Sequence, residues 1–189
     1  MSAIEIHSLT PARLDDYLHF FDTRAFADNA DWSRCYCYFP YCDLKTRAWE
    51  RRTGAENRAS MHEFISSGRA QGYLAYTGEE VVGWCNAAPY TSYAILDSMS
   101  EWEVKDAGAI VCFVVCPTHR GQGIAKALLG SACDGLKAQG LRKVYAKPFK
   151  DAANTAENYP GPLAMYLAAG FSPVREDSKG NVIVQKSLD

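Results

Sequence analysis

The chain has 189 residues and a mass of 20.9 kDa, which suits one domain, 1–189. Hydrophobic residues make up 48% and charged residues 22%, so wholesale disorder is excluded. A formal net charge of −2 offers no basic surface for a phosphate backbone, so we expect no nucleic-acid partner. The sequence shows neither an apolar stretch of roughly 18 residues nor a leader-like N-terminal pattern. We therefore expect a cytoplasmic protein without membrane contact.

Hydrophobic periodicity and turn residues predict the elements of the N-terminal half. In chain order these are a strand at 3–9, a helix from Thr10 to about Phe21, an aromatic and cysteine-rich stretch without clear period at 22–43, two helical pieces within 45–67, and a hairpin of strands 72–77 and 81–87. Thr10 is expected as the N-cap, because proline follows at the first helical position.

The C-terminal half alternates strands and helices. After a loop at 89–107, the predicted elements are a strand at 109–115, an amphipathic helix at 120–139, a strand at 143–149, a short helix at 163–169, and two strands at 171–175 and 181–186. The strand at 109–115 is apolar throughout, which is typical of a strand buried on both faces. The sequence therefore predicts an α/β domain with a mixed central sheet of about seven strands flanked by helices.

Seven cysteines occur in the chain, and most lie inside apolar segments. Cys85, Cys112 and Cys116 are in strand-like runs, and Cys133 is in a predicted helix. This distribution is typical of reduced, buried thiols rather than of a disulfide framework.

The segment VVCPTHRGQGIAK, residues 114–126, carries the strongest functional signal. A buried strand ends at Pro117, a turn contains Gly121 and Gly123, and a helix begins at once. Unsatisfied N–H groups at a helix N-terminus favour an anion, and glycine lets a phosphate approach the backbone. A turn that binds nothing is the alternative. A Walker loop is absent, and the three-glycine dinucleotide pattern is not matched.

Two motifs here resemble those of the GCN5-related N-acetyltransferases (GNAT). Arg120-Gly121-Gln122-Gly123-Ile124-Ala125 matches the Arg/Gln-x-x-Gly-x-Gly/Ala signature, and Tyr166-Leu-Ala-Ala-Gly170-Phe171 is similar to the family's Tyr-x-x-x-Gly-Phe segment. The resemblance covers residues 3–187 approximately. It implies the GNAT fold, with a sheet splayed at the strand that holds the cofactor, and acetyl-CoA as acyl donor.

The resemblance also implies roles for particular residues. The pantetheine arm of acetyl-CoA would pair with the backbone of one strand segment, Phe113, Val114 and Val115. The pyrophosphate would lie on the turn and the first helical residues, Arg120, Gly121, Gln122, Gly123, Ile124, Ala125 and Lys126. Tyr166 would be the general acid that protonates the departing thiolate, which a phenol with a pKa near 10 can do. A core aromatic is the alternative for Tyr166.

Two family features have no clear counterpart. The asparagine that contacts the cofactor arm in many relatives is replaced by Tyr159, with Asn154 and Asn158 nearby. No glutamate occupies the strand after the long helix, so the general base is unassigned. Glu101 and Glu103 are the nearest carboxylates by sequence, and a solvated pair is their alternative reading.

In the fold that the GNAT resemblance implies, the aromatic stretch between the first two helices would form one wall of the acceptor pocket. The candidate pocket residues are Trp32, Tyr36, Tyr38 and Trp84, with Phe39 and Tyr41 beside them. A hydrophobic cluster beneath a long loop is the alternative. Zinc at Cys35, Cys37, Cys42 and His62 is disfavoured, because Cys-x-Cys is an awkward chelate, and we expect no metal. Cys112 could be a nucleophile, but a thiol in an apolar strand is usually inert packing.

These observations predict an acetyl-CoA-dependent N-acetyltransferase that acts on a primary amine of a small molecule by direct transfer in a ternary complex. A protein or peptide acceptor is one alternative, and a non-catalytic acetyl-CoA sensor is another. The sequence leaves monomer and homodimer equally open.

Overall fold

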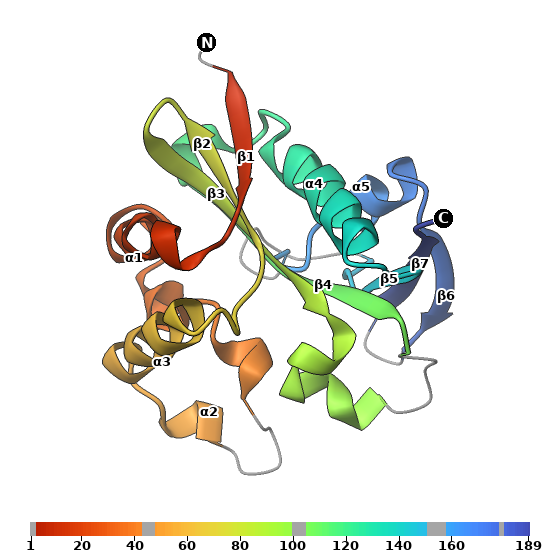
Figure 1. Ribbon diagram of the computed structural model, residues 1–189, viewed down its shortest axis with the longest axis horizontal. Helices are drawn as coiled ribbons and strands as arrows, with labels where there is room; N and C mark the ends of the chain where they lie inside the picture. The colour runs from red at the N-terminus through yellow and green to blue at the C-terminus, as the bar shows by residue number, and fades with distance from the viewer. Residues whose placement is uncertain (1–2, 43–47, 100–104, 151–157, 178–179) are drawn as a thin grey trace.

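A single mixed sheet of seven strands lies at the centre of the computed structural model, which describes residues 3–42, 48–99, 105–150, 158–177 and 180–189 (Figure 1). The strands are β1 Ile4–Ser8, β2 Tyr73–Thr77, β3 Glu80–Pro89, β4 Ala107–Val115, β5 Lys143–Ala146, β6 Ser172–Glu176 and β7 Val182–Ser187. Their order is β1-β2-β3-β4-β5-β7-β6, and among these pairs only β4 and β5 run parallel. The predicted α/β class and mixed sheet are confirmed.

Helices cover both faces of the sheet (Figure 1). Their bounds are α1 Leu14–Thr23, α2 Ala48–Arg51, α3 Gly54–Ser66, α4 Ile124–Ala138 and α5 Leu163–Ala168. On one face, Tyr17 of α1 packs edge-on against Trp84 of β3, with ring centroids 5.0 Å apart. On the other face, a Cβ on Gly83 would lie 2.8 Å from Ile124 Cγ2, so glycine at this position lets α4 approach β3 closely.

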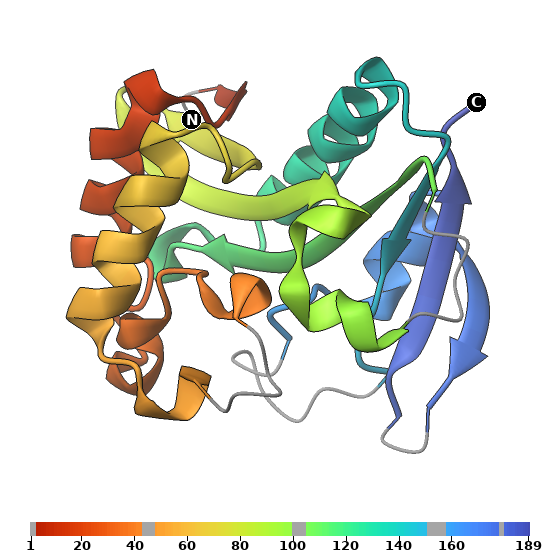
Figure 2. The ribbon, with the colours of Figure 1, turned by 60° about the horizontal axis from the view of Figure 1, so that its bottom comes forward.

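The sheet opens between its two central strands. The parallel pairing of β4 with β5 ends at Ile110 and Ala146, while β3 continues along β4 to Val115. The register of β3 and β4 shifts so that Val111 is an extra residue, which is a β-bulge and increases the local twist. Figure 2 shows β4 and β5 side by side at one end and apart at the other. The far half of β4 is thus without a strand neighbour on this edge, and the predicted splay is confirmed.

The structure differs from the predicted elements at the ends of two of them and within one predicted loop. The long helix begins at Ile124 rather than near Arg120, because the positive φ values of Gly121 and Gly123 cannot continue a helix. The predicted strand 143–149 ends at Ala146, and Phe149 forms only an isolated bridge with Asn181. Part of the predicted loop 89–107 forms two short 3-10 helices, Tyr90–Ser92 and Ala94–Met99.

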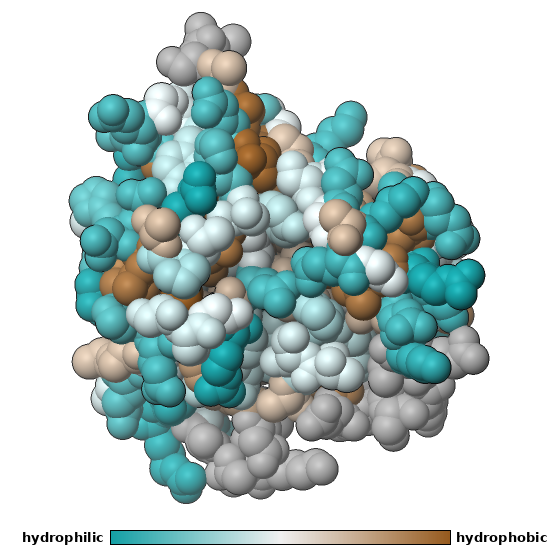
Figure 3. Space-filling view, viewed as in Figure 1, coloured by the Kyte–Doolittle hydropathy of each residue, from teal (hydrophilic) through white to brown (hydrophobic). Residues whose placement is uncertain are grey.

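The molecular surface seen in Figure 3 is mainly hydrophilic, with small and separate hydrophobic patches. Across the described ranges, no helix is both long and apolar enough to span a membrane.

Candidate active site

A cleft of about 1550 Å³ runs along the free edge of β4. It is lined by the turn before α4 and by aromatic side chains from the segment between α1 and α3. Pockets for one small ligand usually measure about 300–1,000 Å³, so this cleft has room for more than one. Nine of the ten residues expected to bind the cofactor line it: Phe113, Val114, Val115, Arg120, Gly121, Gly123, Ile124, Ala125 and Lys126.

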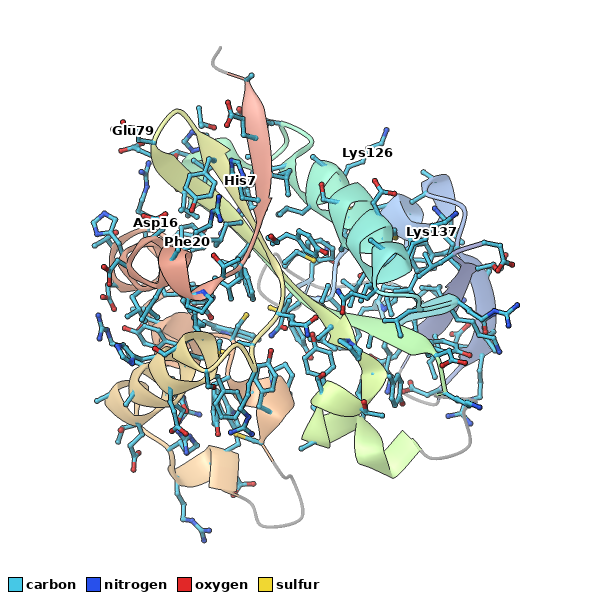
Figure 4. All side chains as sticks on the ribbon, in the orientation of Figure 1. His7, Asp16, Phe20, Glu79, Lys126 and Lys137 are labelled. Carbon is cyan, nitrogen blue, oxygen red and sulfur yellow. The ribbon has the colours of Figure 1, made fainter. Side chains whose placement is uncertain are left out.

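The turn before α4 has the geometry of an anion-binding site. Gly121 and Gly123 have φ values of +75° and +81°, and no atom lies within 4 Å of a Cβ built on either. No side chain caps the N-terminus of α4, and its first turn contains no acidic residue. The amides that begin the helix therefore face the cleft at the positive end of the helix dipole. Figure 4 shows Lys126 at this end of α4 and Lys137 at the other.

Arg120 and Gln122 behave differently from the glycines beside them. The Arg120 guanidinium pairs with the carboxylate of Asp28, which follows α1, and its Nε donates to the Val115 carbonyl at 3.3 Å. The hydrogen bond from Arg120 lowers the pKa of Asp28. Gln122 donates to the Thr118 carbonyl at 3.3 Å and does not line the cleft. Arg120 thus connects the two sides of the cleft in this structure.

The free edge of β4 is partly occupied by the chain itself. The Phe113 amide donates to the Tyr159 carbonyl at 2.6 Å, and the Val115 carbonyl accepts from Arg120. An extended ligand that pairs with β4 would replace both partners. Asn158, next to Tyr159, lines the cleft and has a buried Oδ1 with no hydrogen-bond donor among the described residues.

Tyr166 lies behind this segment. Its ring is fully buried, packs against Phe171 with centroids 5.0 Å apart, and does not itself line the cleft. Its hydroxyl donates to the Pro160 carbonyl at 2.6 Å. Burial raises the pKa of Tyr166 well above its ordinary value, so the phenol stays protonated at neutral pH. The short segment 158–162 therefore separates the protonated hydroxyl of Tyr166 from the cleft.

The aromatic wall of the cleft differs in part from the predicted set. Trp32 lines the cleft and stacks near Tyr159, at 5.8 Å between ring centroids. The other three predicted residues do not line it: Tyr36 bonds Asp22 through its hydroxyl, Tyr38 lies under Arg52, and Trp84 is buried against α1. Apart from Phe113, the additional residues with phenyl, phenol or indole rings that line it are Phe26, Phe39, Trp49, Tyr90, Tyr145 and Tyr159. Phe39 stands in the aromatic stretch, whereas the sequence gives no signal for Trp49 or Tyr145.

Two buried asparagines hold the aromatic segment, one against β3 and one against α3. Asn86 of β3 accepts from the hydroxyls of Tyr41 and Tyr93, at 3.1 and 2.8 Å, and donates to the Cys37 carbonyl at 3.3 Å. Asn57 of α3 donates to the Arg34 carbonyl at 2.8 Å. Both side chains are fully buried, and their hydrogen bonds fix the position of this wall.

Other candidate groups are placed as follows. Glu101, Glu103 and Asn154 lie outside the described residues. Lys147 lines the cleft and forms an ion pair with Asp177, at 2.9 Å between Nζ and Oδ2. Within the described part of the chain, no group of three or more His, Cys, Asp or Glu side chains is arranged to hold a metal.

The family profile described as "Acetyltransferase (GNAT) family" matches residues 41–171. The chain belongs to this family. The match includes the glycine turn, β4 and Tyr166. A comparison with curated protein sequences gives no significant match.

Solved structures with the same fold are only distantly related in sequence. An N-acetyltransferase from Staphylococcus aureus Mu50 has a TM-score of 0.61 and 18% identity, with full coverage of both chains. The PaiA N-acetyltransferase from Thermoplasma acidophilum, in complex with coenzyme A, has a TM-score of 0.58, 15% identity and coverage of 98% and 99%. The ribosomal-protein-S18-alanine N-acetyltransferase from Escherichia coli has a TM-score of 0.52, 18% identity and coverage of 99% and 95%. These structures share the fold with this chain.

Proposed function

We propose that this acetyltransferase moves the acetyl group of acetyl-CoA to a primary amine of a small molecule by direct transfer in a ternary complex. The observation that carries the proposal is one continuous cleft that is lined both by an anion-binding turn and by aromatic side chains. Its volume of about 1550 Å³ allows donor and acceptor to be bound together.

The donor would lie along β4. The pyrophosphate would take the amides that begin α4, and Lys126 would add a positive charge there. The pantetheine arm would replace Tyr159 as the partner of the Phe113 amide, and the unpaired Oδ1 of Asn158 would accept one of its N–H groups. The coenzyme A in the Thermoplasma structure supports this choice of donor.

The transfer itself requires two proton movements. The neutral amine attacks the thioester carbonyl, the C–S bond breaks, and the departing thiolate takes a proton. Tyr166 is proposed as the general acid, because burial keeps its phenol protonated. Its hydroxyl would exchange the Pro160 carbonyl for the thiolate when the 158–162 segment yields to the donor. The base that takes the amine proton is unassigned.

The aromatic side chains of the cleft favour an apolar or aromatic amine as acceptor. Trp32, Phe39 and Trp49 line the cleft, and Tyr90 and Tyr145 line it as well. Flat aromatic surfaces bind apolar groups and stack on rings. The ribosomal-protein-S18-alanine enzyme shares the fold, so short peptides belong in the acceptor panel as the competing class.

The test is chromatographic detection of free CoA after the protein is mixed with acetyl-CoA and a panel of amines. The panel holds aromatic and aliphatic amines, amino acids, polyamines, amino sugars, aminoglycosides and short peptides. Chromatography avoids the background that seven cysteines would give with a thiol dye. We expect acceptor-dependent CoA release with small amines, and intersecting rather than parallel double-reciprocal lines.

A variant of Trp32 tests whether the acceptor binds at the aromatic wall. Trp32→Ala should raise the acceptor KM and leave the acetyl-CoA Kd nearly unchanged, because Trp32 is not part of the turn proposed to hold the pyrophosphate. An unchanged KM would remove Trp32 from the acceptor pocket. Release with peptides alone would replace the proposed acceptor class, and tight acetyl-CoA binding without release to any amine would favour a sensor.

A further inference from the structure

Two thiols meet inside the cleft. Cys37, from the segment between α1 and α3, and Cys112 of β4 have their Sγ atoms 3.0 Å apart, although 75 positions separate them in the chain. Both side chains are buried, with exposed fractions of 1% and 8%, and both line the cleft. Cys112 directly follows the β-bulge at Val111, so its position depends on the splayed part of the sheet. The two sulfur atoms are closer than ordinary packing of two thiols requires.

A strained turn places the Cys37 sulfur. Tyr36 and Cys37 have φ values of +44° and +48°, a left-handed conformation that residues other than glycine adopt rarely. The turn is held from several elements: the Tyr17 hydroxyl donates to the Tyr36 carbonyl at 2.7 Å, and Asn86 donates to the Cys37 carbonyl at 3.3 Å. Such strain persists only where the surroundings enforce it, and it often marks a function.

The surroundings of the pair are polar in an otherwise apolar core. The buried Nε1 of Trp84 has no hydrogen-bond partner among the described residues, and its N–H lowers the pKa of the Cys37 thiol. The Cys35 side chain also lowers the pKa of the Cys37 thiol. Burial nevertheless raises the pKa of the Cys37 thiol well above its ordinary value, so this thiol is protonated at neutral pH. Oxidation of the Cys37 thiol alone is therefore slow, and the close approach of the Cys112 sulfur directs its product.

We propose that Cys37 and Cys112 are an oxidation site. A small hydroperoxide would oxidise the two thiols to a reversible disulfide that joins β4 to the segment between α1 and α3. This proposal rests on the two thiols and their setting, and does not depend on the acceptor or on acetyl transfer.

The reaction balances with hydrogen peroxide as the oxidant. One sulfur attacks a peroxide oxygen, the O–O bond breaks, and water leaves as a sulfenic acid forms. The second sulfur attacks the first, the S–O bond breaks, and a second water leaves as the S–S bond forms. Two electrons pass from the thiols to the peroxide, and both thiol protons leave in the water. A dithiol reductant reverses the change through thiol–disulfide exchange.

The experiment uses the full-length protein, treated with hydrogen peroxide and then alkylated in denaturant. Chymotrypsin cleaves after Tyr36, Tyr38 and Phe113, so Cys35, Cys37, Cys112 and Cys116 fall on different peptides. We expect a Cys37–Cys112 cross-linked peptide that dithiothreitol removes. The Tm should rise by about 5 °C or more on oxidation, because the bond closes a long loop. The peptide map needs no variant and therefore does not depend on how a mutant folds.

Variants provide the controls. Cys37→Ser and Cys112→Ser should each abolish the cross-link and the rise in Tm. Cys133→Ser, a buried thiol of α4 outside the pair, should retain both. A map in which Cys37 and Cys112 stay alkylated or oxidise separately would overturn the proposal, as would a disulfide that joins other cysteines instead.

Discussion

Gly123 combines two requirements of the proposed phosphate site in one residue. Its φ of +81° is rarely adopted by other residues, and the space where a Cβ would stand is open. It also immediately precedes Ile124, the first residue of α4, so a side chain there would project among the uncapped amides. Conformation and access are therefore both lost if this position changes.

Gly123→Glu should weaken acetyl-CoA binding at least about tenfold, or about 1.4 kcal/mol, because a carboxylate would take the place of the pyrophosphate. Isothermal titration calorimetry measures the affinity. Gly130→Glu, an exposed position on the same helix, adds the same charge away from the turn and should bind normally. Gly123→Ala measures the contribution of backbone strain alone. Normal acetyl-CoA affinity in Gly123→Glu would refute the assignment of the turn.

Tyr166→Phe separates the proposed chemical role from the structural one. The variant should lower kcat by about a hundredfold, within the usual effect of a general acid, and leave the acetyl-CoA Kd nearly unchanged. Its free energy of unfolding should fall by about 1–2 kcal/mol, because the Pro160 carbonyl loses a donor.

Tyr76→Phe is the matched control for Tyr166→Phe. Tyr76 is nearly buried, and its hydroxyl donates to Asp16 at 2.7 Å, away from the cleft. Loss of this hydroxyl should reduce stability while kcat is kept. If Tyr166→Phe also kept its kcat, Tyr166 would be a core residue only.

Hydrophobic periodicity predicted the helices and strands that local sequence determines, but it did not predict features that depend on how strands pair with one another. The apolar run of β4 and the four-residue repeat of α4 were sufficient to predict both elements. The bulge at Val111 and the early end of β5 depend on the register between strands, which no local pattern contains. The aromatic wall shows the same limit. Trp84 lies on the face of β3 that packs against α1, whereas Trp49 lines the cleft because of tertiary packing.

Asn86 links the aromatic segment and Tyr93 to β3 through three hydrogen bonds. Asn86→Leu would leave the Cys37 carbonyl and the Tyr41 and Tyr93 hydroxyls without a partner. We expect a loss of about 2–4 kcal/mol in the free energy of unfolding, measured by urea denaturation. The acceptor KM should rise, whereas the acetyl-CoA Kd should not, because the hydrogen bonds of Asn86 go to Cys37, Tyr41 and Tyr93 and not to the turn before α4.

Thr53→Ala is the control for Asn86→Leu. Thr53 forms a capping box with Glu56 at the start of α3, so its loss should cost about 1 kcal/mol without changing the acceptor KM. An acceptor KM that rises equally in both variants would show that lower stability alone, and not the position of the aromatic segment, affects the cleft.

At the scale of the whole molecule, buried phenols lie on both faces of the sheet. Tyr17 and Tyr93 are fully buried on the α1 face, and Tyr166 is fully buried on the other. Burial raises the pKa of each well above its ordinary value, since an anion in the core would lose its hydration. Burial also raises the pKa of Tyr159, in the segment beside β4, to about 12. The folded protein therefore holds these groups neutral at a pH where the unfolded chain ionises them.

The consequence is a loss of stability in alkali. Below pH 10 these tyrosines are neutral in both states, so their contribution is complete; above pH 10 the unfolded chain releases protons that the folded protein retains. Each such group should then lower the free energy of unfolding by about 1.4 kcal/mol per pH unit until its folded pKa is reached. Urea titrations at pH 8, 10 and 11 should show a midpoint that is nearly constant at first and then falls. Tyrosinate absorbance should rise together with unfolding for the buried rings, and Tyr93→Phe should make the decline less steep. A urea midpoint at pH 11 equal to that at pH 8 would mean that these rings ionise in the folded state, and that the core around β3 and β4 admits water.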